Sequence, residues 1–178
     1  MKHAMLDLET WGTKPGSALR SIGIVQFDPR TAGFGMEMYC NLDLEDQLKY
    51  GATQDKSTVD WWARQSEEAQ AALMENQLPL KEAVHKVCEF FRKSRCQFVW
   101  AQGSNFDPVL LEHTMSFINV NPPWRFYNTR DTRTAYGIAG YDTKRMPRQG
   151  TYHNALDDAK HQVRCVYKSY ELLHGKSE

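Results

Sequence analysis

Short apolar runs of strand length mark the first part of the chain, at residues 3–9, 21–27 and 35–42. A turn around Pro29 follows the second run, and the connection to the third run is short. Consecutive strands joined by short connections usually pair side by side. The pattern therefore predicts that the chain opens with a meander of three strands.

Helical spacing of apolar positions dominates later parts of the chain. Residues 57–74 form the first predicted helix, with a Ser or Thr cap at its start. A second predicted helix follows Pro79, a favoured first-turn residue, and carries its apolar stripe over residues 80–91. The best-defined helix runs from residue 154 to about residue 173, before Gly175. Its stripe consists of Leu156, Ala159, Val163, Val166, Tyr170 and Leu173.

The middle of the chain combines a fourth strand with shorter elements. Residues 97–101 are a compact apolar run that predicts a strand leading toward Asp107. Asp107 followed by Pro108 is typical of a helix N-cap with proline at the first helical position. Residues 122–135 are predicted to form a loop, a short strand and a short helix.

The order of these elements predicts an α/β fold with a mixed sheet and helices packed on it. The chain has 178 residues, enough for one domain that buries roughly 70% of the surface exposed by its unfolded form. No repeat, low-complexity tract or linker divides it, so we expect a single domain over residues 1–178. In such folds, ligands bind at strand ends and helix starts.

Composition narrows the cellular setting. The chain carries 22 basic and 22 acidic residues, so its formal net charge is zero. Any phosphate-binding surface must therefore be a local cluster of basic residues. The four cysteines form no CxxC pair, which favours reduced thiols in a cytosolic protein. No apolar run is long enough for a signal peptide or a membrane span. We therefore expect a soluble cytoplasmic protein with no membrane partner.

Asp7 and Glu9 are the first candidates for chemistry. Residues two apart in a strand project to the same face, so their carboxylates should lie side by side at the end of the first strand. The flanking Leu6 and Leu8 indicate an inner strand, where unpaired carboxylates are costly. A cation between the two carboxylates would remove the repulsion, and oxygen ligands suit Mg²⁺ or Mn²⁺.

A second cluster lies at the start of the last helix. If Asn154 is the N-cap, His153 and Asp158 occupy positions that are neighbours in space. Asp157 is the rival carboxylate, but helix geometry turns it further from the apolar stripe, so we expect it to face solvent. The other five histidines have no comparable partner. Asp107 can both cap a helix and bind a metal, because a carboxylate has lone pairs for both.

Aromatic residues near these acids are candidates for substrate contact. Trp11 follows Thr10 directly beyond the carboxylate pair. In the pair Trp61-Trp62, we expect Trp62 to fill core space and Trp61 to contact substrate by stacking.

Three cations precede His153, namely Lys144, Arg145 and Arg148. They are candidates for phosphate contact, and a solvated basic loop is the alternative interpretation.

The acids and the histidine together resemble the three motifs of the DEDDh, or DnaQ-like, 3′-5′ exonucleases. The motifs are Asp7-Leu8-Glu9-Thr10, Phe106-Asp107, and His153 with Asp158 five positions later. More closely, the chain looks like short exodeoxyribonuclease VIII-like proteins of phages and prophages and the related mycobacterial-type exoribonucleases. The residues of this closer resemblance are Gly12, Ser21-Ile22-Gly23, Trp61-Trp62, Met146-Pro147 and His153-Asn154-Ala155-Leu156.

This resemblance implies a ribonuclease H-like fold with a five-stranded mixed sheet flanked by helices. It also implies that Asp7, Glu9, Asp107 and Asp158 hold two divalent metals, Mg²⁺ or Mn²⁺, and that His153 is the general base. The implied activity is 3′-5′ release of nucleoside 5′-monophosphates from single-stranded nucleic acid. DNA is the favoured substrate. An exoribonuclease trimming RNA 3′ ends or oligoribonucleotides is one alternative, and an inactive nucleic-acid-binding module is another. The resemblance leaves the oligomeric state open.

Overall fold

Five strands form one mixed sheet at the centre of the computed structural model, which describes residues 1–175, with the backbone alone at positions 68, 69 and 72. The order across the sheet is β3-β2-β1-β4-β5. β1 is antiparallel to β2 and parallel to β4; β2 and β3 are antiparallel, and β4 and β5 are parallel. The predicted five-stranded mixed sheet is confirmed. The strands are β1 His3–Thr10, β2 Leu19–Phe27, β3 Phe34–Asn41, β4 Phe98–Ala101 and β5 Thr129–Asp131.

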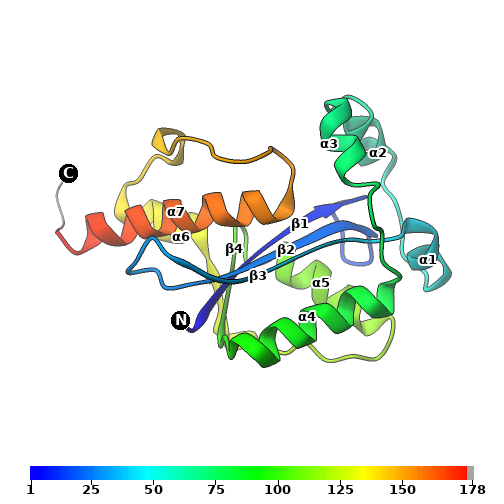
Figure 1. Cartoon of the computed structure of the whole chain (residues 1–178), viewed down its shortest axis with the longest axis horizontal. Coiled ribbons are helices and arrows are strands. Elements are labelled where there is room, and N and C mark those ends of the chain that lie inside the picture. Colours follow the sequence, from blue (N-terminus) through cyan, green and yellow to red (C-terminus); the bar gives the residue numbers. More distant parts are fainter. Residues whose placement is uncertain (176–178) are drawn as a thin grey trace.

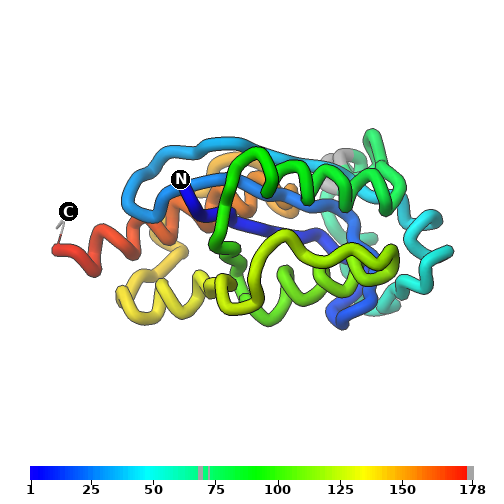
Figure 2. The backbone as a smooth tube through the Cα atoms, turned by 90° about the horizontal axis from the view of Figure 1, so that it is seen from below, coloured from blue at the N-terminus to red at the C-terminus, as the bar shows by residue number. Residues whose placement is uncertain are grey.

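Helices cover both faces of the sheet (Figure 1). α4 (Leu80–Ser94) and α5 (Asp107–Ser116) pack on one face, which Figure 2 shows from below. α6 (Thr132–Ala139) and α7 (Ala155–Leu173) pack on the other. The shorter helices are α1 (Leu44–Lys49), α2 (Lys56–Trp62), α3 (Glu67–Ala72), η1 (Phe126–Asn128) and η2 (Thr143–Arg145). α2 and α3 project beyond the sheet near the end of β1.

The alternation along β1 decides which face carries the acids. Leu6 and Leu8 enter the core on the α4 and α5 side, whereas Met5 packs in the core under α7. Because side chains alternate along a strand, Asp7 and Glu9 share the α7 side with Met5. The sheet therefore presents both carboxylates toward the helix that begins after His153.

Gly23 lets the start of α7 rest on the sheet. It pairs with Asp7 across β1 and β2. A Cβ atom at this position would lie 2.2 Å from the carbonyl carbon of Ala155 and 2.3 Å from the backbone nitrogen of Leu156. Backbone atoms at that distance cannot move aside without shifting the helix. Glycine therefore sets the close approach of α7 to β1.

We expect Gly23→Ala to destabilise the protein by about 1–3 kcal/mol, the usual cost of overpacking. It should also lower the catalytic rate, because it pushes the first turn of α7 away from Asp7. Urea unfolding and a nuclease assay measure the two effects. The control is Gly137→Ala on α6, where an added Cβ meets nothing within 4 Å and should leave stability unchanged or slightly higher. Equal behaviour of the two variants would contradict this role of Gly23.

The prediction of one helix over residues 57–74 is wrong, because α2 and α3 are separate helices. The indole of Trp62 donates a hydrogen bond to the carbonyl of Thr10 at 2.9 Å, which anchors the end of α2 to β1. The next residues turn with short-range bonds, from Arg64 N–H to the Trp61 carbonyl and from Gln65 N–H to the Trp62 carbonyl. The contact between Trp62 and Thr10 therefore ends α2, although the helical spacing of the sequence continues beyond it.

The other predicted helices agree with the structure in position, including the last helix capped by Asn154. None of the helices within residues 1–175 is both long and apolar enough to cross a membrane. The single domain expected over residues 1–178 stays a prediction, and its last three residues lie outside the described part of the chain.

Candidate active site

Asp107 joins the two acids of β1 through a backbone contact. Its Oδ1 accepts a hydrogen bond from the backbone N–H of Leu8 at 3.1 Å, and the residue is only 4% exposed. The predicted N-cap role is wrong: Asp107 is the first residue of α5, and Phe106 in the cap position makes no side-chain cap bond. Its carboxylate instead binds the backbone of β1 at Leu8, and this contact brings the start of α5 to the end of β1.

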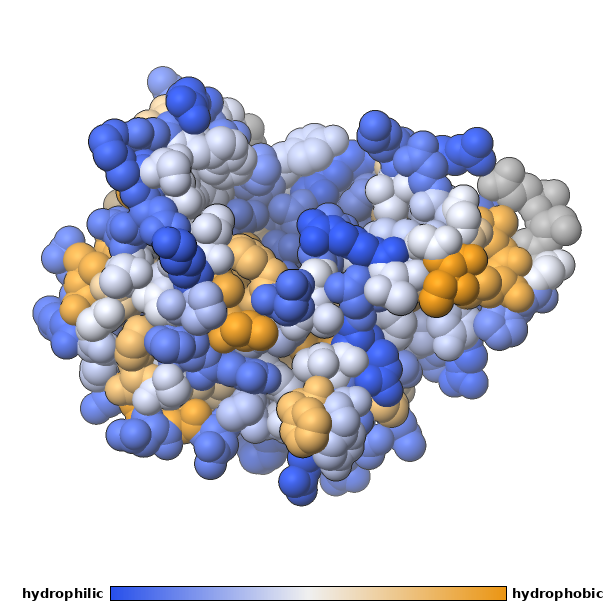
Figure 3. Space-filling view, turned by 180° about the vertical axis from the view of Figure 1, so that it is seen from behind, coloured by the Kyte–Doolittle hydropathy of each residue, from blue (hydrophilic) through white to orange (hydrophobic). Residues whose placement is uncertain are grey.

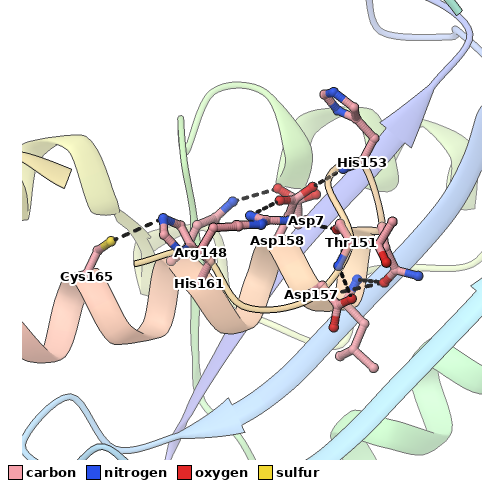
Figure 4. Close-up of polar contacts among 11 residues, drawn as sticks. Asp7, Arg148, Thr151, His153, Asp157, Asp158, His161 and Cys165 are labelled. Carbon is pink, nitrogen blue, oxygen red and sulfur yellow. Dashed lines mark hydrogen bonds and ion pairs between the residues drawn. The ribbon is translucent and has the colours of Figure 1, made fainter. Parts of the chain in front are cut away.

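The start of α7 brings His153 and Asp158 together (Figure 4). Asn154 caps the helix, its Oδ1 accepting from the backbone nitrogens of Leu156 and Asp157 at 3.1 Å each. The backbone N–H of His153 donates to Oδ2 of Asp158 at 3.1 Å. One ligand atom each from Glu9, His153 and Asp158 lie within 4.8 Å of one another. The structure thus brings together the residues that the spacing predicted to be neighbours.

His153 adopts a backbone conformation that is unusual for a residue other than glycine, with φ at +61°. Its ring packs edge-on against Trp61, with centroids 4.9 Å apart, and against Trp62 at 5.9 Å. Trp62 is 3% exposed, so its predicted core position is confirmed, whereas Trp61 is 37% exposed. The two indoles therefore hold the imidazole at the mouth of the site, and contact between Trp61 and substrate stays a prediction.

Asp157 does not face solvent as expected. Its Oδ2 accepts from the backbone N–H of Thr151 at 2.8 Å, and the backbone of Gly150 packs closely on its carboxylate. The side chain is partly buried and lies outside the cluster of acids. Asp157 therefore folds the loop before α7 back onto the helix, a contact that the helical period alone does not reveal.

The acids lie in a cavity of about 770 Å³. In Figure 3, which shows the molecule from behind, a hollow with a mostly hydrophilic surface separates the α2 and α3 projection from the region of α6 and α7. The cavity walls come from β1, the segment that follows β4, α5, α6, η2, α7 and the loop before α7. Its lining includes Asp7, Glu9, Asp107, His153 and Asp158.

Two of the three predicted cations line this cavity, Lys144 and Arg148. Arg145 is exposed and does not line it, so the structure does not bring Arg145 to the acids. Arg148 forms an ion pair with Asp158, donates to the carbonyl of Thr151 at 2.8 Å and lies over the ring of Tyr152. Arg148 is therefore built into the site, rather than extending from a solvated loop.

Thr10 and Trp11 are not in the cavity lining. Thr10 is 8% exposed, and its carbonyl is used by Trp62. Trp11 packs instead against Arg20, whose guanidinium carbon lies 4.1 Å from the ring centroids of both Trp11 and Trp62. Sequence reasoning missed Arg20, which is buried within the chain and has no local motif to mark it.

Gln162, His161 and Arg133 also line the cavity and were missed. Gln162 donates from Nε2 to Oδ1 of Asp7 at 2.6 Å. It lies four residues after Asp158, and that helical spacing is the signal that could have identified it. His161 has a buried Nδ1 without a partner among the described residues, so it belongs to the wall of the site.

Burial and mutual repulsion change the titration of the acids. Burial, followed by repulsion from Asp158 and Asp107, raises the pKa of Glu9 to about 8, and the Arg20 guanidinium opposes part of this rise. Burial also raises the pKa of Asp107 to about 7. The pKa of Asp7 is raised well above its usual value by burial and by the other carboxylates. Without a cation, the fold therefore holds protons on these groups.

This donor set fits a divalent metal. Carboxylate oxygens and one imidazole meet at one wall, and oxygen-rich sites suit hard cations such as Mg²⁺ or Mn²⁺. Burial and the neighbouring carboxylates raise the pKa values of Asp7 and Glu9, and the Arg20 guanidinium opposes only part of the rise at Glu9. A bound divalent cation would add positive charge beside these carboxylates.

The same shifts predict how stability depends on pH. The folded-state pKa values of Glu9 and Asp107 exceed their unfolded values of about 4. Above that pH, the folded chain therefore binds more protons than the unfolded chain does. Stability without metal must then fall as pH rises from about 4 through the folded-state pKa values near 7 and 8. We expect the melting temperature to drop by several degrees between pH 6.5 and 8.5, at roughly 2–4 °C per kcal/mol.

Thermal melts in EDTA and in Mn²⁺ measure this effect. Mn²⁺ should raise the melting temperature more at pH 8.5 than at pH 6.5, because it binds the ionised carboxylates. The control is Glu9→Gln, which removes one titrating acid and should reduce the dependence on pH. A melting temperature in EDTA that stays constant or rises over this range would contradict the prediction.

Comparison with known proteins finds a matching sequence family. The sequence matches the family described as "3′-5′ exoribonuclease Rv2179c-like domain" over residues 2–170. No curated protein matches the sequence closely enough to count as a relative.

Solved structures with the same fold include several nucleases. One is described as "3′-end specific recognition of histone mRNA stem-loop by 3′-exonuclease", with a TM-score of 0.61 and 13% identity over 97% of this chain and 82% of that one. A second is the nuclease domain of 3′hExo, a DEDDh family member, bound to rAMP, with a TM-score of 0.59 and 12% identity over 97% and 92%. A third is exonuclease X in complex with 5′ overhanging duplex DNA, with a TM-score of 0.57 and 11% identity over 99% and 94%. At such low identity, these likenesses establish the fold.

Proposed function

This chain belongs to the 3′-5′ exoribonuclease Rv2179c-like domain family and is a 3′-5′ exonuclease, and on that premise we propose that it uses two divalent metals to trim single-stranded RNA from the 3′ end. The observation that carries the proposal is the convergence of β1, α5 and the start of α7. They bring four acids and one histidine to the wall of a single cavity. These are the residue types for which the DEDDh nucleases are named.

RNA is supported by the description of the family as exoribonucleases. The sequence alone favoured DNA, and solved structures with this fold carry either RNA or DNA in their descriptions. The closer resemblance to exodeoxyribonuclease VIII-like proteins therefore stays a prediction. Because discrimination depends on contacts with the 2′-hydroxyl, a direct comparison of the two nucleic acids decides between them.

In the proposed mechanism, Asp7, Glu9, Asp107 and Asp158 hold the metals. When bound, the two ions would offset the charge of the scissile phosphate and of the attacking and leaving oxygens. The four acids come from three separate elements, and hydrogen bonds hold three of them, Asp107, Asp158 and Asp7. The site is thus organised before substrate arrives, as electrostatic catalysis requires.

His153 is proposed to take the proton from the attacking water. Its side chain lies beside Glu9 and Asp158 and packs against Trp61 and Trp62. A neutral imidazole held within reach of a reacting water is the most common general base in enzymes. The two indole rings therefore orient the base.

Other cavity residues are proposed to bind the nucleic acid. Lys144, Arg148 and Arg133 line the cavity and are cations available to the phosphates. Trp61 and Tyr152 are exposed aromatic residues whose rings both lie near the His153 ring, and they are suited to stacking on bases. The products would be nucleoside 5′-monophosphates, released one at a time.

The test uses matched single-stranded RNA and DNA of the same sequence, each labelled at the 3′ or the 5′ end. With Mg²⁺ or Mn²⁺, 3′-labelled RNA should release labelled mononucleotide first, and 5′-labelled RNA should shorten stepwise. EDTA should stop both reactions. Faster degradation of DNA would overturn the RNA assignment, and turnover in EDTA would overturn the role of the metals.

A further inference from the structure

Gln162 contacts the acid cluster through the carboxylate of Asp7. It lies on α7 and is 4% exposed. Its Nε2 donates to Oδ1 of Asp7 at 2.6 Å, the shortest contact that this carboxylate makes with a side chain among the described residues. The backbone at this point is held as well, because the hydroxyl of Tyr136 donates to the Gln162 carbonyl at 3.3 Å. The amide is therefore fixed in place before any ligand binds.

The other half of this amide has no partner. Oε1 of Gln162 is buried and accepts no hydrogen bond from residues 1–175. A buried acceptor without a donor is destabilising, so such atoms are rare in native proteins. Gln162 also lines the cavity that contains the acids. The position therefore requires a donor that the described chain does not supply.

A neutral amide suits this place better than a cation does. A lysine or arginine beside Asp7 would pair with its carboxylate, as Arg148 does with Asp158, and would compete with a metal for Asp7. An amide donor instead fixes one oxygen of Asp7 and leaves its charge available. Mg²⁺ and Mn²⁺ reach proteins hydrated, and Mg²⁺ keeps several of its waters when bound. Such a water is a donor of the kind that Oε1 lacks.

We propose that Gln162 is a positioning residue for the divalent metal: Nε2 holds Asp7 in its metal-binding orientation, and Oε1 accepts a hydrogen bond from a water that arrives with the ion. This inference rests on the proposed function, because it assumes that Asp7 binds a metal. Partners that orient metal ligands commonly contribute 10- to 100-fold in metal affinity. Gln162 should therefore set the metal concentration at which the enzyme works.

The experiment measures Mn²⁺ binding to the full chain by electron paramagnetic resonance, together with the Mn²⁺ dependence of RNA degradation. Gln162→Met keeps the volume and removes both polar atoms. It should weaken Mn²⁺ binding roughly 10- to 100-fold. The Mn²⁺ concentration for half-maximal rate should rise equally, and saturating Mn²⁺ should restore most of the rate. Gln162→Asn, a shorter amide, should show the same shift, and it serves as the test if the methionine variant does not fold.

Gln47→Met is the matched control. Gln47 is a second buried glutamine, 1% exposed, and it bonds both backbone groups of Leu19. Its replacement should lower the melting temperature without changing Mn²⁺ affinity. If the Gln162 variants bind Mn²⁺ as tightly as the natural chain, the inference is wrong while the proposed function stands. If the natural chain itself binds no divalent metal, both are wrong.

Discussion

Asp158→Asn should lower kcat on the order of 10²- to 10⁴-fold, whereas Asp157→Asn should retain most of the activity. The neighbouring acids have different surroundings. Asp158 contacts the backbone of His153 and lies with Glu9 at the cavity, whereas Asp157 binds the backbone of Thr151. Losing one metal-holding carboxylate removes several kcal/mol of transition-state stabilisation, at about 1.4 kcal/mol for each factor of ten.

The pair of variants is its own control, because both change one carboxylate to an amide in the first turn of α7. An asparagine at position 157 can still accept from Thr151, so the loop before the helix should keep its conformation. Rates at saturating Mg²⁺ and RNA measure the difference. Similar losses in the two variants would show that the helix start, rather than the Asp158 carboxylate, determines the activity.

His153→Ala should lower the rate on the order of 10²- to 10⁴-fold, the usual contribution of a general base. The four acids remain, so Mn²⁺ binding should stay within a few-fold of the natural chain. RNA binding should also persist, because the cations of the cavity are untouched. Single-turnover rates and Mn²⁺ titration separate these effects.

The matched control is His85→Ala, an exposed histidine on α4, on the opposite face of the sheet. It should behave as the natural chain does. A near-normal rate for His153→Ala would exclude His153 as the base. A large loss of Mn²⁺ affinity in that variant would instead indicate that the imidazole is a metal ligand, consistent with its place beside Glu9 and Asp158.

Local sequence patterns were sufficient to predict the parts of this protein that follow a strand or helix period or begin at a helix cap. The two-residue period of β1 puts Asp7 and Glu9 on one face, and the cap at Asn154 puts His153 next to Asp158. These contacts depend on residues at most five apart, so their geometry follows from the regular dihedral angles of strands and helices. The mixed sheet and the candidate acids were accessible for this reason.

Contacts between distant segments decided the rest. Asp107 is not a cap because its carboxylate accepts from Leu8, 99 residues away in sequence. The helix predicted over residues 57–74 ends early because Trp62 is anchored to β1.

The same limit applies inside the site. Arg20 reaches the acids, and Arg145 does not, because of packing that no local period encodes. Gly23 determines how closely α7 approaches the sheet, through backbone contacts with a segment more than 100 residues later. Local sequence patterns identified the residues that could carry the chemistry. Which of these residues meet depends on the packing of whole elements, because that packing forms the long-range contacts.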